Sequence, residues 1–191
     1  MWYECVLREW KPRSNLIILI PCARRKPYHK SVTHRYFFKK VWELWKKDMC
    51  DLVILSEPLT VVPAEYDYPC PKYPLYDYPP AIIKKKNHFS KSEVAIWRSR
   101  LRRFLSIHNQ HACYFILYKY HRKLLGDILE SHCRGGIYTE RPYISKAVEL
   151  SLEMIKNKEK EFCVMSGVNV CIGKMNLKKE ILKPLEEGFV G

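Results

Sequence analysis

Residues 16–34 are LIILIPCARRKPYHKSVTH, an uninterrupted apolar run that ends at Pro21 and continues as a strongly basic stretch. A short run without polar alternation is typical of a parallel strand buried on both faces. Downstream, Phe38, Val41 and Trp45 recur at helical spacing, which predicts an amphipathic helix over 34–47. Residues 51–55, DLVIL, form a second apolar run. The order strand, helix, strand is therefore expected from the start of the chain.

The alternation of strands and helices continues to the C-terminal part of the chain. Ser90 and Glu93 form a capping-box pattern ahead of a helix, and Pro142 stands at a predicted helix start. Further strands are predicted at 112–118 and 162–165, and further helices around 124–129 and 175–185. We expect an α/β fold of three layers, a mostly parallel central sheet with helices on both faces, formed as a single domain over 1–191.

The stretch from residue 58 to residue 80 contains many prolines and tyrosines but no usable period, which predicts a long ordered or flexible loop. In α/β folds, ligands bind beyond the carboxyl ends of the parallel strands. We therefore expect residues 21–34 and 56–77 to lie on the same rim of the sheet.

The net charge of +14, from 34 Lys and Arg against 20 Asp and Glu, favours a polyanionic partner, nucleic acid first. A basic surface without any partner is the alternative. The cations cluster, and aromatic residues are interleaved with them, as stacking on unpaired bases requires: Tyr28, Tyr36, Trp97, Tyr118 and Tyr120. The predicted nucleic-acid contacts are Arg24, Arg25, Arg98, Arg102 and Arg103.

Several classes of protein are disfavoured by the sequence. No apolar stretch approaches the roughly 18 residues that span a bilayer, and the first residues lack the pattern of a secretion signal, so we expect a cytoplasmic protein without a membrane partner. The eight cysteines form no CxxC pair, which argues against a zinc site and predicts mostly reduced, buried thiols. We expect neither a metal nor a cofactor.

Residues 21–34 concentrate reactive side chains directly ahead of a predicted helix. A helix N-terminus and neighbouring cations stabilise a thiolate, which makes Cys22 the best nucleophile candidate. His34 has the chemistry of a general acid or base near neutral pH. The alternative is structural: Cys22 packs under the loop, the cations are solvated, and His34 belongs to the first turn of the helix.

The spacing P-C-x3-K-P-Y-x2-S-x2-H in this stretch resembles the signature of the archaeosine synthase family. A second segment, SEPLTVVPAEYDYP at 56–69, is similar to another part of that family. The resemblance covers roughly the first eighty residues well and the rest by general layout. It implies a set of catalytic residues comprising Cys22, Lys26, Tyr28, Ser31 and His34. As substrate-binding residues we predict Pro21, Ser56, Glu57, Glu65 and Asp77.

The resemblance also implies a substrate and partners. The expected reaction is transfer of a nitrogen donor, with lysine as co-substrate, to the nitrile of 7-cyano-7-deazaguanine in an archaeal tRNA, giving an amidine-type product. Family members are commonly larger, so we expect a catalytic module and a separate RNA-binding or radical-enzyme subunit. Two alternatives stay open: a non-catalytic tRNA-binding or nucleic-acid-binding subunit, and a glycosylase-like enzyme that would release a free base.

Overall fold

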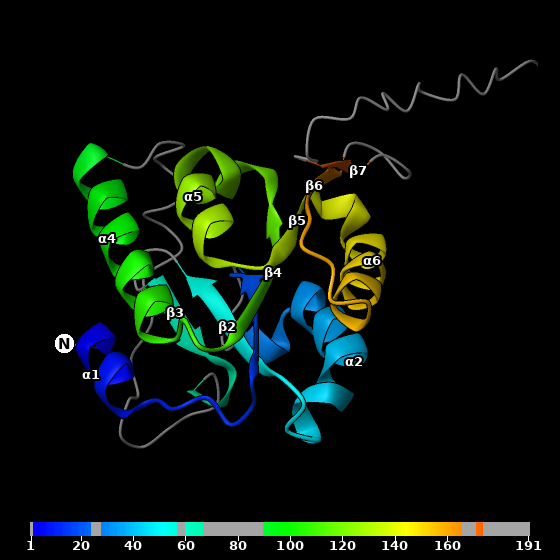
Figure 1. The fold of residues 1–191 in the computed structure, drawn as a ribbon, viewed down its shortest axis with the longest axis horizontal. Coiled ribbons are helices and arrows are strands. Elements are labelled where there is room, and N and C mark those ends of the chain that lie inside the picture. Colours follow the sequence, from blue (N-terminus) through cyan, green and yellow to red (C-terminus); the bar gives the residue numbers. More distant parts are fainter. Residues whose placement is uncertain (1, 24–27, 57–59, 67–89, 166–170, 174–191) are drawn as a thin grey trace, which may run out of the picture.

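The computed structural model describes residues 2–23, 28–56, 60–66, 90–165 and 171–173 (Figure 1). The core is one seven-stranded sheet in the order β3-β2-β1-β4-β5-β6-β7. Neighbouring strands from β2 to β6 are parallel, whereas the edge strands β3 and β7 are antiparallel to their neighbours. The strands are β1 (Leu16–Pro21), β2 (Asp51–Ser56), β3 (Thr60–Pro63), β4 (Ala112–Tyr118), β5 (Gly135–Thr139), β6 (Phe162–Met165) and β7 (Cys171–Gly173).

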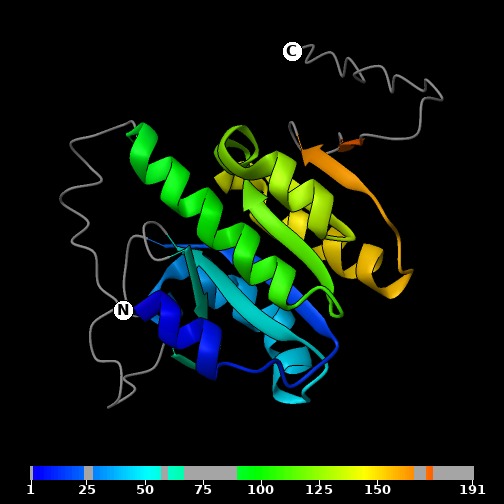
Figure 2. The ribbon, with the colours of Figure 1, turned by 60° about the vertical axis from the view of Figure 1, so that its left-hand side comes forward.

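Helices cover both faces of the sheet (Figures 1 and 2). The α-helices are α1 (Trp2–Glu9), α2 (Val32–Lys46), α4 (Lys91–Ile107), α5 (Lys119–His132) and α6 (Ile144–Lys156). Short 3-10 helices are η1 (Tyr28–Lys30), η2 (Ala64–Tyr66) and η3 (Arg141–Tyr143). No helix within the described ranges is long and apolar enough to cross a membrane.

Successive side chains of the central strands pack alternately into two hydrophobic cores, one on each face of the sheet. Ile17 and Leu19 of β1 face a cluster formed with α1, α4 and α5, whereas Ile18 and Ile20 face a cluster formed with α2 and α6. All four side chains are at most 1% exposed. The uninterrupted apolar run thus belongs to a strand covered on both sides. The predicted three-layer α/β fold with a mostly parallel sheet is confirmed.

Several elements differ from the sequence-based expectation. The predicted loop at 58–80 contains β3 and η2, so that prediction is wrong for residues 60–66. We did not predict α1, β5 or β7, and α5 is longer than the predicted helix around 124–129. The capping box is confirmed, since Ser90 Oγ accepts from the Glu93 amide and Glu93 accepts from the Ser90 amide. The predicted helix at 175–185 lies outside the described residues.

Four of the cysteines in the described ranges have reduced thiols, namely Cys22, Cys50, Cys113 and Cys133. Cys163 is disulfide-bonded and is an exception to the expectation that most of the thiols are reduced.

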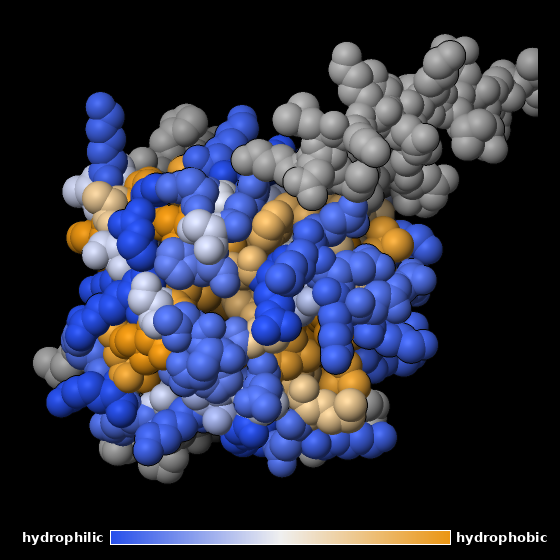
Figure 3. Space-filling view, viewed as in Figure 1, coloured by the Kyte–Doolittle hydropathy of each residue, from blue (hydrophilic) through white to orange (hydrophobic). Residues whose placement is uncertain are grey.

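The surface seen in Figure 3 is predominantly hydrophilic, with smaller apolar areas between the hydrophilic side chains.

Gly136 in β5 tolerates no side chain, which leads to a prediction about stability. A Cβ atom there would lie 2.5 Å from the ring of Phe115, which is fully buried and packs against Tyr138 and Phe162. Gly136→Ala is therefore expected to lower the free energy of unfolding by about 1–3 kcal/mol, measured by urea denaturation. Gly126→Ala is the matched control, because its Cβ would lie no nearer than 3.2 Å to any neighbour, the Arg122 side chain, and alanine favours the helix. Equal stability of the two variants would contradict this packing.

Candidate functional site

Cys22 lies at the carboxyl end of β1 and is held there by the neighbouring strand. Its amide donates a hydrogen bond of 3.2 Å to the carbonyl of Leu55, which extends the pairing of β1 and β2 beyond Pro21. The thiol is reduced and half-buried. Pro21, a predicted substrate-binding residue, is buried within β1 opposite Leu55. The reactive side chain is therefore attached to the sheet itself.

Tyr28 joins the basic stretch to the end of β2. Its hydroxyl lies 2.8 Å from Oγ of Ser56, the last residue of β2, and the two side chains are 0% and 1% exposed. Because β1 and β2 are parallel, Ser56 and Cys22 lie at the same edge of the sheet. The structure thus brings together Cys22, Tyr28 and Ser56.

Ser31 and His34 belong to the start of α2. Ser31 is the N-cap residue, and its carbonyl accepts from the Arg35 amide at 2.8 Å. The ring of His34 is 0% exposed, with its centroid 5.2 Å from that of Tyr28 and 6.1 Å from that of Phe37. The N-terminus of α2, with its partial positive charge, therefore lies at the edge that carries Cys22.

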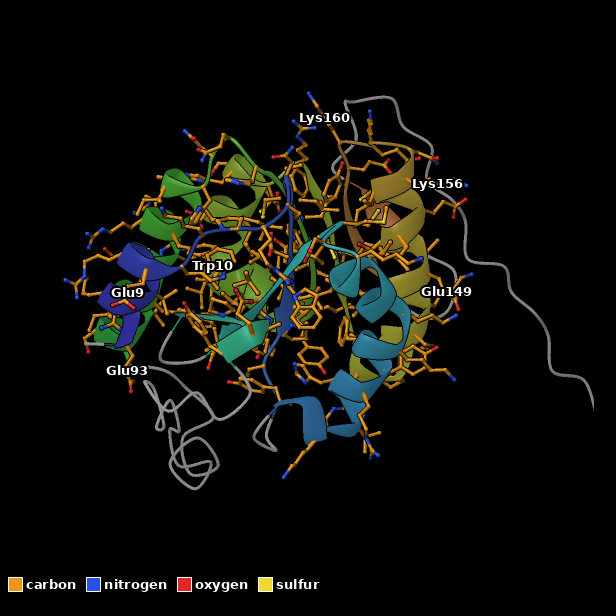
Figure 4. The ribbon with its side chains drawn as sticks, turned by 90° about the horizontal axis from the view of Figure 1, so that it is seen from below. Glu9, Trp10, Glu93, Glu149, Lys156 and Lys160 are labelled. Atoms are coloured by element: carbon orange, nitrogen blue, oxygen red, sulfur yellow. The ribbon has the colours of Figure 1, made fainter. Side chains whose placement is uncertain are left out.

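Glu65 lies at the opposite end of the sheet. Because β3 runs antiparallel to β2, with Ser56 opposite Thr60 and Val53 opposite Pro63, the chain returns to the amino ends of the parallel strands. There Glu65 accepts a hydrogen bond from the indole of Trp10, which lies inside the molecule (Figure 4). Burial raises the pKa of the Glu65 carboxyl, and hydrogen bonds oppose this only in part. The expectation that residues 56–77 share one rim is therefore wrong for Glu65. Glu65 lies about four residues along the strands, or roughly 13 Å, from the rim that carries Cys22.

Two of the three described arginines proposed as nucleic-acid contacts are engaged in ion pairs within the chain. Arg98 donates to the carbonyl of Leu124 and to both oxygens of Asp127, which lowers the pKa of the Asp127 carboxyl. Arg103 pairs with Glu4 at 3.1 Å, and Arg102 is exposed. Arg98 and Arg103 therefore connect α4 to α5 and to α1, and any role toward RNA stays a prediction.

The remaining predicted residues, Arg24, Arg25, Lys26, Glu57 and Asp77, lie outside the described residues. Among the residues that are described, no group of three or more His, Cys, Asp or Glu is arranged to hold a metal ion. Sequence reasoning did not single out His121, whose ring stacks on that of Tyr120 in the first turn of α5. A lone histidine in a helix carries no pattern that would have indicated it.

Comparison with known proteins gives a family and a set of relatives. A family model described as "Domain of unknown function (DUF5591)" matches residues 1–169. The archaeosine synthase subunit alpha of Methanosarcina acetivorans is 28% identical over 152 residues, covering 80% of this chain and 23% of that protein. The archaeosine synthase of Methanocaldococcus jannaschii is 36% identical over 69 residues, covering 33% of this chain and 12% of that protein. The archaeosine synthase subunit alpha of Thermococcus kodakarensis is 34% identical over 71 residues, with 35% and 12% coverage.

The chain thus spans less than a quarter of the length of these curated relatives. A solved structure, the crystal structure of AF0587, a protein of unknown function, matches with a TM-score of 0.56 and 24% identity, over 86% of this chain and 52% of that one. At that identity the match supports the fold alone. Since the family model covers most of the sequence, the chain belongs to the DUF5591 family and is a relative of the archaeosine synthases.

Proposed function

We propose that residues 1–191 are the catalytic module of a tRNA-modifying transferase in archaeosine formation. The module converts the nitrile of 7-cyano-7-deazaguanine in tRNA to an amidine-type product by addition of lysine. The observation that carries the proposal is the half-buried, reduced thiol of Cys22 beside the Tyr28–Ser56 hydrogen bond and the N-terminus of α2. The names of the relatives supply the reaction class.

The chemistry requires a nucleophile and a proton for the developing nitrogen anion. In the proposed sequence the Cys22 sulfur adds to the nitrile carbon, and the nitrogen takes up the proton that left the thiol. The amine of lysine then adds to the same carbon, the C–S bond breaks, and the sulfur leaves with the bonding electrons and recovers a proton from the amine. One N–H bond has been added across the nitrile, and no oxidant or reductant is consumed.

The burial of the other side chains supports positioning roles for them. Tyr28, Ser56 and His34 are at most 1% exposed, so in this proposal they hold the Cys22 stretch and the start of α2 in place behind the thiol. Lys26 is proposed to stabilise negative charge on the substrate. The net charge of +14 supports a tRNA substrate.

The partners belong to the same proposal. The curated relatives are at least four times longer than the parts that this chain matches, so other polypeptide segments or subunits are proposed to supply part of the RNA binding. A radical enzyme is proposed to act on the lysine adduct. The alternative of a non-catalytic tRNA-binding subunit keeps the same basic surface but assigns Cys22 no chemistry.

The proposal is tested by mass analysis of tRNA that carries 7-cyano-7-deazaguanine, after incubation with the protein and lysine. A modified nucleoside heavier by the mass of one lysine is the expected result. Unmodified tRNA that nevertheless binds the protein would overturn the transferase and favour the binding subunit. Release of a free base would instead identify the glycosylase-like alternative.

A further inference from the structure

The strand order reverses direction between β1 and β4. From β1 the chain passes through α2 to β2 on one side, whereas from β4 it passes through α5 to β5 on the other. The two helices lie on opposite faces of the sheet. In open α/β sheets, the crevice beyond the carboxyl ends of the strands at such a reversal is where ligands bind.

Cys22 and Tyr118 are the residues that flank this reversal. The paired register of β1 and β4 runs from Leu16 opposite Ala112 to Leu19 opposite Phe115, and Cys22 and Tyr118 each lie three residues beyond this last pair. Both side chains are partly buried and pack against the same core cluster. Tyr118 therefore ends the strand that neighbours β1, on the sheet face where Cys22 packs.

Three aromatic rings gather where β4 passes into α5. The centroids of Tyr120 and His121 are 4.0 Å apart, and those of Tyr118 lie 6.1 Å and 6.2 Å from the other two. The interplanar angles are only 19° to 29°, so the three rings are nearly parallel. His121 is fully buried and its Nδ1 lies 3.2 Å from the carbonyl of Tyr118, whereas Tyr120 is 40% exposed. An anchored ring thus supports an exposed one.

We propose that Tyr118 and Tyr120, supported by His121, form a stacking platform for an unpaired nucleobase of the RNA substrate and hold that base beside Cys22. Aromatic faces next to cations bind unstacked bases in proteins that recognise single-stranded RNA. The inference rests on the proposed function and adds the place where the base is held. Of the other aromatic residues near the cations, Tyr28 and Trp97 are at most 2% exposed and are unsuited to the task.

The platform has a defined ligand class. Stacking reads the flat face of a ring and tolerates any base, so single-stranded RNA is bound and the bases of a duplex, already stacked on each other, are excluded. Charge contributes less at this point, because Lys119 is paired with Glu140 at 2.6 Å and Arg122 lies 3.6 Å from Glu130. The aromatic rings are therefore expected to dominate binding here.

The test compares binding of a short fluorescein-labelled single-stranded RNA with binding of the same RNA annealed to its complement, by fluorescence anisotropy on the full chain. Tyr120→Ala is expected to raise the Kd for the single strand about 5- to 100-fold, and Tyr120→Phe by less than about 2-fold. Tyr120→Leu keeps apolar area without an aromatic face and should behave as Tyr120→Ala. Met49→Ala, the truncation of another exposed apolar side chain near the amino end of β2, is the control that should leave Kd unchanged.

A wild-type protein that does not bind the single strand, or Kd values equal for wild type and Tyr120→Ala, would overturn the platform. So would an equal loss of affinity for the duplex. Since the binding measurement involves no chemistry, its outcome is independent of the tRNA mass analysis. A platform without lysine transfer would overturn the proposed reaction, and lysine transfer without dependence on Tyr120 would overturn the platform.

Discussion

Replacing Cys22 with alanine is expected to reduce formation of the lysine adduct on tRNA by about three orders of magnitude or more. The physical reason is that the sulfur is the atom that forms the covalent bond in the proposed sequence, and loss of a nucleophile removes the whole two-step route. The measurement is the initial rate of adduct formation by mass analysis of digested tRNA. The affinity for tRNA should stay within about twofold, because the thiol contributes little binding area.

Cys50→Ala is the matched control for this experiment. The Cys50 side chain is 0% exposed, and burial together with the charge of Asp51 raises the pKa of its thiol to about 12. It is therefore unreactive at neutral pH, and its removal should leave the rate of adduct formation unchanged. Full activity of the Cys22→Ala protein would remove the covalent mechanism, and equal losses in the two variants would point to a general effect on folding.

The largest pH effect on stability is expected from His108. Its side chain is 7% exposed and packs against Trp10 and Phe104, with centroids 5.1 Å and 4.7 Å away. Burial first, and the neighbouring His111 second, lower the pKa of His108 to about 4 from 6.5. Between these values the unfolded chain binds more protons than the folded one, so stability falls as the pH is lowered from about 6.5 to 4. The shift corresponds to a loss of about 3 kcal/mol from this group, measured by urea denaturation across that range.

His108→Gln isolates the contribution of this histidine. The variant should lose less stability on acidification than the wild type, because glutamine takes up no proton in the folded or the unfolded chain. Glu65 acts in the opposite direction, since burial raises its pKa and favours the folded state when the carboxyl is protonated. Because Glu65 is present in both proteins, its contribution cancels when the pH profile of the variant is subtracted from that of the wild type. Parallel pH profiles of variant and wild type would show that His108 is not the group that destabilises the acid form.

The sequence was informative where one physical requirement dominates a segment. The apolar run at 16–20 allows only a strand buried on both faces, and Ser90 with Glu93 marks the start of α4. β5 was missed because Gly135 and Gly136 are poor strand formers in isolation. They are required there by the close approach of neighbouring atoms, among them the Phe115 ring, which no local pattern reveals.

The candidate site was partly predictable for the same reason. Cys22, Tyr28 and Ser56 follow two parallel strands, and the ends of such strands meet at one edge. The position of Glu65 depends on the direction of β3, which a proline-rich stretch does not indicate. The degree of burial could not be predicted from the sequence either, since nothing in the motif distinguishes the half-buried Cys22 from the fully buried His34.

The hydrogen bond from the Cys22 amide to Leu55 has a mechanical consequence. Because the Cys22 sulfur is attached at the end of a strand, the rigid sheet restricts its position, and the sulfur has little freedom to follow a substrate that moves. Any partner that reacts with it must supply the motion, approach along one direction, and present its electrophilic atom at one point in space. A nucleoside within a folded RNA must therefore flip out of its helix before the reaction begins.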